Sequence, residues 1–263
     1  LDHTLWDFER NSALAFAKLL TQYEVPVSLA DFLAVYSPIN ISYWERFRKD
    51  QVTKINLRRW RLMDSFAVFS LRYDVDILDQ MAETYIQELP KNNHLFPGVM
   101  PTLEYLKAQY RLHIITNGFH QVQHTKLINS GLDHYFDSVT TSEEVGVKKP
   151  NPVIFRFALE KVKAKPSASI MIGDNFEADI VGADHEHRDL GLDALDFTVL
   201  ETPKDILGAV AALAESHRFA CTEVALICRG ASAVVGDRVA KQDHIDVAFL
   251  SGSDAGFMVA HPF

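Results

Sequence analysis

Two short apolar runs constrain the fold of this chain most, because each one ends abruptly in small polar residues. Leu112–Ile115 runs into Thr-Asn-Gly at 116–118, and Ser169–Ile172 runs into Gly-Asp at 173–174. The segment between them contains helical patterns, one of which begins at Pro152, where the missing N–H of proline costs nothing. Strands that alternate with helices at this spacing indicate parallel βα units, so the sequence predicts an α/β fold with a doubly wound parallel sheet.

The region from 11 to 95 has a different character, because its apolar residues recur at helical spacing without strand-like alternation. The clearest faces carry Leu14, Phe16, Leu19 and Leu20 in one helix, and Ile77, Leu78, Met81 and Tyr85 in another. We therefore expect an α/β core from 1–10 and 96–216, an inserted α-helical cap at 11–95, and a C-terminal extension of undetermined structure at 217–263. Strand candidates in the later part are Ser138–Thr141, Val224–Cys228 and Ile245–Leu250.

Composition excludes several classes of protein. The net charge of −9 argues against a nucleic-acid polymer as partner, since phosphate contacts require clustered Lys and Arg. No apolar run approaches the roughly 20 residues that cross a bilayer, so we expect no membrane partner. Cys221 and Cys228 are the only cysteines, which fits buried thiols in a reducing compartment and a cytoplasmic protein. Nothing in the sequence indicates an oligomeric state.

Four polar segments are expected at the C-terminal ends of predicted strands: 2–4 (Asp-His-Thr), 116–118, 148–150 (Lys-Lys-Pro) and 173–179. In open α/β sheets, ligands bind at the carboxyl ends of the strands. Together the segments supply carboxylates, a hydroxyl group and an amine. Carboxylate oxygens suit Mg²⁺, whereas hydroxyl and ammonium donors suit phosphoryl oxygens. The sequence therefore favours a small phosphorylated molecule bound together with a metal ion.

The order of these segments resembles the haloacid dehalogenase-like phosphohydrolase superfamily. Its four motifs are an Asp-x-Asp-x-Thr turn, a strand that ends in Thr or Ser, a Lys usually followed by Pro, and Gly-Asp-x-x-x-x-Asp. The corresponding residues here are Asp2 to Thr4 (incomplete), Ile114 to Gly118, Lys149-Pro150, and Gly173 to Asp179. The resemblance extends from residue 1 to about 183, and the helical insertion between the first two motifs matches the helical-cap subclass.

The resemblance implies a phosphomonoester hydrolase that acts through an aspartyl-phosphate. Asp2 would protonate the leaving oxygen and then activate water. Thr116, together with the N–H groups of Asn117 and Gly118, would hold the phosphoryl oxygens. Lys149 would neutralise charge on the phosphoryl group and on the nucleophile, because a carboxylate that attacks a phosphate dianion must overcome repulsion.

The resemblance also implies Mg²⁺ as cofactor, held by Asp174 and by the backbone carbonyl of Asp2, with Asp179 in support. In the family motif the nucleophilic Asp stands immediately before the position of Leu1, at the end of the first strand. We therefore expect this polypeptide, as given, to be inactive.

Within the superfamily, the sequence of segments 116–119, 142–150 and 173–179 is most similar to that of bacterial pyrimidine 5′-nucleotidases. This similarity implies a nucleoside 5′-monophosphate as substrate. Two alternatives stay open. One is a 2-haloacid dehalogenase of the same fold, which attacks carbon and needs neither a metal nor Asp2. The other is a non-catalytic binding protein that has kept the fold.

Each motif alone also has an ordinary structural explanation. Lys149-Pro150 is typical of a surface turn, and Gly173-Asp174 is typical of the start of a helix. The segment 184–187 (Asp-His-Glu-His) offers metal-binding side chains, but neighbouring ligands on a helix diverge, so we interpret it as a solvated turn. The hydrolase hypothesis depends on the four motifs occurring together and in order.

Overall fold

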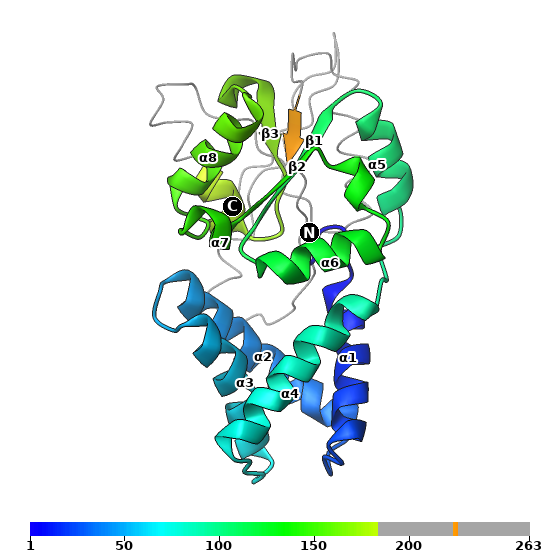
Figure 1. Ribbon diagram of the computed structural model, residues 1–263, viewed down its shortest axis with the longest axis vertical. Coiled ribbons are helices and arrows are strands. Elements are labelled where there is room, and N and C mark those ends of the chain that lie inside the picture. Colours follow the sequence, from blue (N-terminus) through cyan, green and yellow to red (C-terminus); the bar gives the residue numbers. More distant parts are fainter. Residues whose placement is uncertain (184–222, 226–263) are drawn as a thin grey trace, which may run out of the picture. The chain divides into compact units, whose positions relative to one another are not determined.

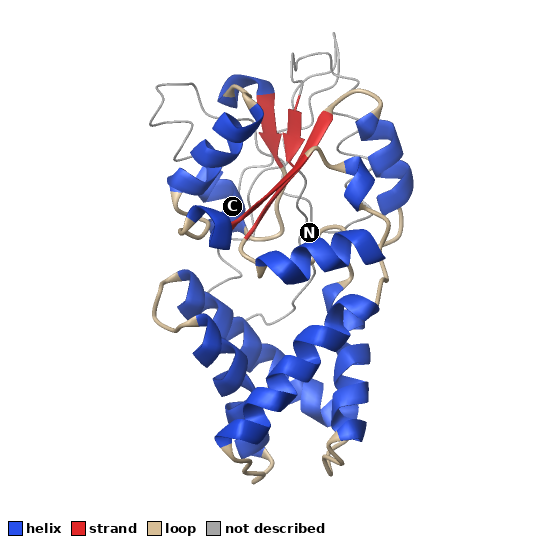
Figure 2. Ribbon diagram, in the orientation of Figure 1, coloured by secondary structure: helices blue, strands red, loops and turns tan. Residues whose placement is uncertain are grey.

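The computed structural model describes residues 1–183 and 223–225 (Figure 1). By their contacts the residues separate into two compact units. The first contains Leu1–Trp6, Leu95–His120 and the described residues from Leu132 onward, and it holds all the strands that Figure 2 colours red. The second contains Asp7–His94 and Gln121–Gly131 and is helical.

The first unit is built on a four-stranded parallel sheet of β1 (Arg111–Thr116), β2 (Ser138–Thr141), β3 (Ser169–Met171) and β4 (Glu223–Ala225), in the order β2-β1-β4-β3. All residues of β1 after the first are buried, as expected for a parallel strand that is covered on both faces. The predicted α/β fold with a parallel sheet is therefore confirmed.

Helices α5 (Val99–Lys107), α7 (Ser142–Val145) and α8 (Pro152–Val162) belong to the same unit. Their ends follow from local sequence. The hydroxyl group of Thr141 accepts a hydrogen bond from the first turn of α7, and Asn151 does the same for α8. One apolar cluster packs α8 against the end of β1, and it consists of Ile115, Ile154, Phe155, Ala158 and Ala183.

Shorter helical segments complete this unit. They are η2 (Asp133–Tyr135), η3 (Pro166–Ala168) and η4 (Phe176–Val181), of which the last is a π-helical turn. The η4 turn follows β3 and contains Asp179, the second aspartate of the fourth predicted motif. Helices of this type are rare and are often found at functional sites.

The second unit is a helical bundle. It comprises α1 (Phe8–Gln22), α2 (Leu29–Arg48), α3 (Lys54–Val68), α4 (Val75–Glu88), the short η1 (Leu89–Lys91) and nearly all of α6 (His120–Asn129). Aromatic rings fill its centre: the ring of Phe16 lies 4.9 Å from Phe32, 4.4 Å from Tyr36 and 4.3 Å from Tyr85, measured between centroids. Such pairs add to the stabilisation that burial alone provides.

Helix α6 differs from the expectation, which assigned all of 96–216 to the core. Residues 121–131, which contain nearly all of this helix, group with the helical unit instead. The ammonium group of Lys126, which is buried, lies 5.4 Å from the ring centre of Phe8 in α1. The side-chain amide of Asn129 also donates a hydrogen bond of 2.7 Å to the carbonyl of Pro90. The buried face of this helix, which includes Gln123, Lys126 and Leu127, explains the assignment.

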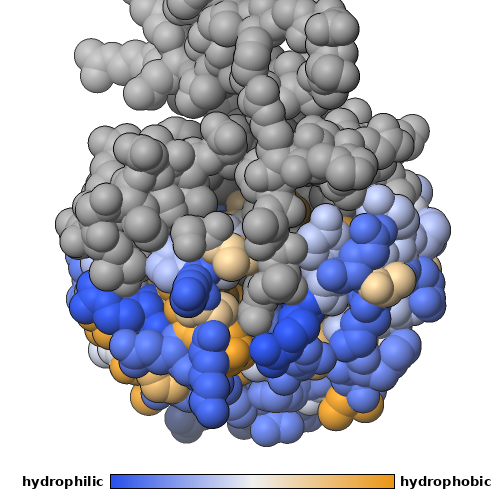
Figure 3. All heavy atoms as spheres, turned by 90° about the horizontal axis from the view of Figure 1, so that it is seen from above, coloured by the Kyte–Doolittle hydropathy of each residue, from blue (hydrophilic) through white to orange (hydrophobic). Residues whose placement is uncertain are grey.

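Of the described helices, none is both long and apolar enough to cross a membrane. Hydrophilic side chains dominate the described part of the face drawn in Figure 3, with smaller apolar patches between them. The segment 184–187, both cysteines and the strand candidate Ile245–Leu250 lie outside the described residues. Of the extension expected at 217–263, only β4 is described, and it overlaps the strand expected at Val224–Cys228.

Candidate active site

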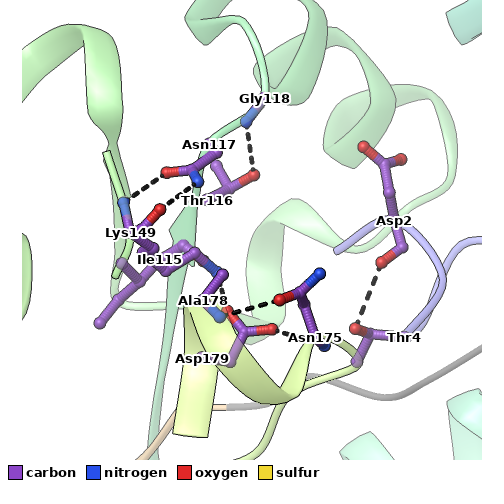
Figure 4. A network of polar contacts seen from close by, with 10 residues as sticks. All are labelled: Asp2, Thr4, Ile115, Thr116, Asn117, Gly118, Lys149, Asn175, Ala178 and Asp179. Atoms are coloured by element: carbon purple, nitrogen blue, oxygen red, sulfur yellow. Dashed lines mark hydrogen bonds and ion pairs between the residues drawn. The ribbon is translucent and has the colours of Figure 1, made fainter. Parts of the chain in front are cut away.

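The residues of the four predicted motifs come together at the carboxyl end of β1 (Figure 4). Thr116 is the last residue of β1 and pairs in register with Thr141, the last residue of β2. Lys149 comes from the loop between α7 and α8, and the 173–179 segment follows β3. Because the strands are parallel, their carboxyl ends share one edge, and the predicted site lies there.

Lys149 is the most constrained side chain of this site. Its side chain is only 8% exposed, and its ammonium group donates a hydrogen bond of 3.0 Å to the carbonyl of Ile115. The same group forms an ion pair with the carboxylate of Asp179, which is 2% exposed. A buried lysine keeps its charge only when it has partners of this kind. The surface turn that the Lys-Pro pair alone would predict is therefore wrong.

The side-chain amide of Asn117 contacts the main chain of Lys149. Its Nδ2 donates to the Lys149 carbonyl at 3.0 Å, and its Oδ1 accepts from the Lys149 N–H at 2.8 Å. The motif resemblance implied only a role for the N–H of Asn117, so this side-chain contact was missed. Nearby, the N–H of Gly118 donates to the hydroxyl group of Thr116 at 3.0 Å, which orders the turn after β1.

The segment after β3 folds back on itself through Asn175. Its side chain accepts from the N–H of Ala178 at 2.8 Å, and its own N–H donates to Oδ2 of Asp179 at 3.0 Å. Gly173 is required by packing, because a Cβ at this position would lie 2.2 Å from the Cβ of Asp179. Asp179 thus uses one carboxylate oxygen for Lys149 and the other for the backbone of its own turn.

Charges are concentrated in this region. Desolvation, and next the nearby Asp179 carboxylate, raise the pKa of Asp174 to about 8, although part of the Asp174 side chain remains accessible. The ammonium group of Lys149 lowers the pKa of Asp174 and the carboxylate of Asp2 raises it, because both charges act on it electrostatically. The start of the described chain therefore lies within the field of the other three motifs.

The residues expected to hold Mg²⁺ are only partly brought together. Among the described residues, no group of three His, Cys, Asp or Glu side chains could hold a metal ion. Asp179 is engaged by Lys149, and Figure 4 shows the Asp2 carboxylate directed away from it. The Asp174 carboxylate and the Asp2 carbonyl, which also accepts from Thr4 at 3.3 Å, are the remaining oxygen donors. Mg²⁺ commonly takes one or two carboxylates and completes its coordination with water and substrate phosphate, so this donor set fits it.

Comparison with known proteins agrees with the motif assignment. A family model described as haloacid dehalogenase-like hydrolase matches residues 1–185. The pyrimidine 5′-nucleotidase YjjG of Escherichia coli strain K12 is 32% identical over 183 residues, which is 69% of this chain and 77% of that protein.

Two solved structures extend the comparison. The magnesium-bound structure of YfnB from Bacillus subtilis has a TM-score of 0.66 at 28% identity and covers 73% of this chain and 83% of its own. A 2-haloacid dehalogenase from Pseudomonas syringae pv. Tomato DC3000 has a TM-score of 0.50 at 26% identity and covers 80% of this chain and 95% of its own. The proteins that this chain resembles thus include a nucleotidase and a 2-haloacid dehalogenase.

Proposed function

The chain belongs to the haloacid dehalogenase-like hydrolases, and on that premise we propose that it is a Mg²⁺-dependent phosphomonoester hydrolase that acts through an aspartyl-phosphate. The observation that carries the proposal is the buried ammonium group of Lys149, held between the Ile115 carbonyl and Asp179 at the end of β1. A cation that is already in place stabilises the charge of a transferring phosphoryl group without reorganisation.

Each residue of the site would have a distinct role in the reaction. The Thr116 hydroxyl and the N–H groups that follow it would orient the phosphoryl oxygens, and Lys149 would offset their charge. A carboxylate before Leu1 would attack phosphorus, while Asp2 protonates the ester oxygen that leaves. Asp2 would then take a proton from the water that hydrolyses the aspartyl-phosphate. Bound Mg²⁺, held by Asp174 and the Asp2 carbonyl, would supply charge neutralisation at the phosphoryl oxygens.

The position of Leu1 supports this assignment of the nucleophile. Leu1 is buried, and its neighbour Asp2 acts electrostatically on Asp174, so a residue attached to Leu1 would lie near the same charged region. The similarity to a pyrimidine 5′-nucleotidase supports a nucleoside 5′-monophosphate as substrate.

A second candidate function is 2-haloacid dehalogenation. It is favoured by the likeness to a dehalogenase structure. That reaction attacks carbon and requires neither the metal nor an acid at Asp2. The two functions differ in what they release and in whether they depend on Mg²⁺.

The test is an assay of the protein expressed from its complete gene. Nucleoside monophosphates, sugar phosphates and 2-chloropropionate are supplied with Mg²⁺ or with EDTA, and released phosphate and chloride are measured. We expect phosphate release with Mg²⁺ only. Chloride release in EDTA would favour the dehalogenase, and release of neither ion would favour a binding protein.

A further inference from the structure

We propose that the side chain of Asn117 is a positioning residue that fixes the main chain of Lys149 and thereby the place of its ammonium group. The inference rests on the proposed function, because it concerns the cation that phosphoryl transfer requires. Two hydrogen bonds carry it, from Nδ2 to the Lys149 carbonyl at 3.0 Å and from the Lys149 N–H to Oδ1 at 2.8 Å (Figure 4). We call these two bonds the Asn117–Lys149 amide pair.

The residue type at 117 fits this role. A carboxamide presents one donor and one acceptor side by side, which matches the N–H and C=O of a single residue. An ionised aspartate would present two acceptors and would face the Lys149 carbonyl with like charge. An apolar side chain of similar shape would satisfy neither main-chain group. The amide pair therefore gives a physical reason for asparagine that is independent of its backbone N–H.

Both the main chain and the ammonium group of Lys149 are hydrogen-bonded to residues at the end of β1. Its main chain is held by Asn117, and its ammonium group is held by the carbonyl of Ile115, two residues earlier in the chain. Strand β1 is itself paired on both sides, with β2 and with β4. A lysine side chain is flexible along its four carbons, so attachment at both ends restricts where its charge lies.

The loop is also packed from another element. A Cβ at Gly182, which follows η4, would lie 2.8 Å from Cα and 2.9 Å from the carbonyl oxygen of Pro150. The Lys149-Pro150 segment therefore has no room to move toward Gly182. If the amide pair were lost, this contact would still limit the loop on that side, but it supplies no hydrogen bond to the Lys149 N–H or carbonyl.

The first test compares Asn117→Ala with Asn151→Ala. Asn151 is a matched control, because it is an asparagine of the same loop whose side chain also makes a main-chain hydrogen bond. That bond only caps α8, since its Oδ1 accepts from the N–H of Val153 at 3.0 Å. With a nucleoside monophosphate and the protein from the complete gene, Asn117→Ala should lower kcat by about 10- to 100-fold while KM changes little, because misplacement of a catalytic group by about 1 Å costs up to about 10²-fold. Asn151→Ala should leave kcat unchanged. Equal effects of the two variants would overturn the proposal.

The second test asks whether Asn117 acts through Lys149. In a Lys149→Met background, a further Asn117→Ala should lower kcat no more, because the charge that Asn117 positions is already gone. A full additional loss would overturn the proposal and assign Asn117 to direct contact with the substrate.

A third measurement does not depend on activity. Hydrogen exchange of the Lys149 amide should become faster in Asn117→Ala and should stay unchanged in Asn151→Ala. Should the unsubstituted protein release phosphate from none of the esters, the proposed function fails, and exchange still decides on the amide pair. Unchanged exchange in Asn117→Ala would overturn it, whereas faster exchange would support it.

Discussion

Lys149 and Asp179 form an ion pair in which both side chains are almost fully removed from water, with 8% and 2% of them exposed. Taking two charges out of water is costly, and their attraction offsets that cost only while both are present. Asp179→Asn should therefore destabilise the protein by about 3–5 kcal/mol, because it removes the hydrogen-bonded counter-ion of the buried Lys149 charge. Urea unfolding at pH 7 measures the change.

The exposed pair of Glu144 and Lys161 provides the control, with side chains 30% and 32% exposed and a separation of 2.8 Å. Glu144→Gln should cost at most about 1 kcal/mol, since water screens both charges. Adding Lys149→Met to Asp179→Asn should recover part of the lost stability. If Asp179→Asn and Glu144→Gln had equal effects, the buried pair would not be the stabilising feature described here.

At the scale of elements, Asp137 connects the end of α5 with the start of β1. It accepts hydrogen bonds from Lys107 at 3.0 Å and from Arg111 at 3.1 Å, and these bonds, that of Lys107 first, lower its pKa below the ordinary value. A lowered pKa in the folded state stabilises the protein above the unfolded-state pKa, and the effect is lost as the pH falls through the folded-state pKa. Asp137→Asn should therefore reduce stability at neutral pH, by less than about 1 kcal/mol because the pair is partly exposed, and should have no effect well below about pH 3.9.

Urea unfolding of Asp137→Asn and of the unsubstituted protein, at pH 7 and in strong acid, tests this expectation. Asp133→Asn, in the nearby η2, changes the net charge equally and serves as the control for charge alone. A difference between Asp137→Asn and the unsubstituted protein that persisted unchanged in acid would contradict the role of ionised Asp137.

Much of the element order could be predicted from the sequence, because local patterns determine it. The strand at Ser138–Thr141 and the helix that begins at Pro152 are found as expected. The grouping of α6 with the helical unit could not be predicted, since it depends on Lys126 meeting Phe8 from a distant part of the chain. The amide pair of Asn117 was missed for the same reason: a Thr-Asn-Gly turn contains no signal for what the Asn side chain will contact.

At the scale of the whole molecule, β4 is decisive because it is the only connection between β1 and β3 among the sheet pairings described. Val224 pairs with Leu112 on one side and with Ile170 on the other. Val224→Pro removes an N–H from the middle of this ladder and should unfold the sheet at lower urea concentration. Val224→Ala keeps the N–H and should have a smaller effect. Equal midpoints for the Pro variant and the unsubstituted protein would contradict the central place of β4.

The place of β4 also has a consequence for synthesis on the ribosome. It lies in the middle of the sheet, yet it is the last described element along the chain. Domains fold as their segments emerge during synthesis. The pairing of β1 and β3 with β4 therefore cannot form until residue 225 has left the exit tunnel. Among the described residues, the helical unit ends at Gly131. Nascent chains arrested between these two points should therefore contain a formed helical bundle and an unfinished sheet.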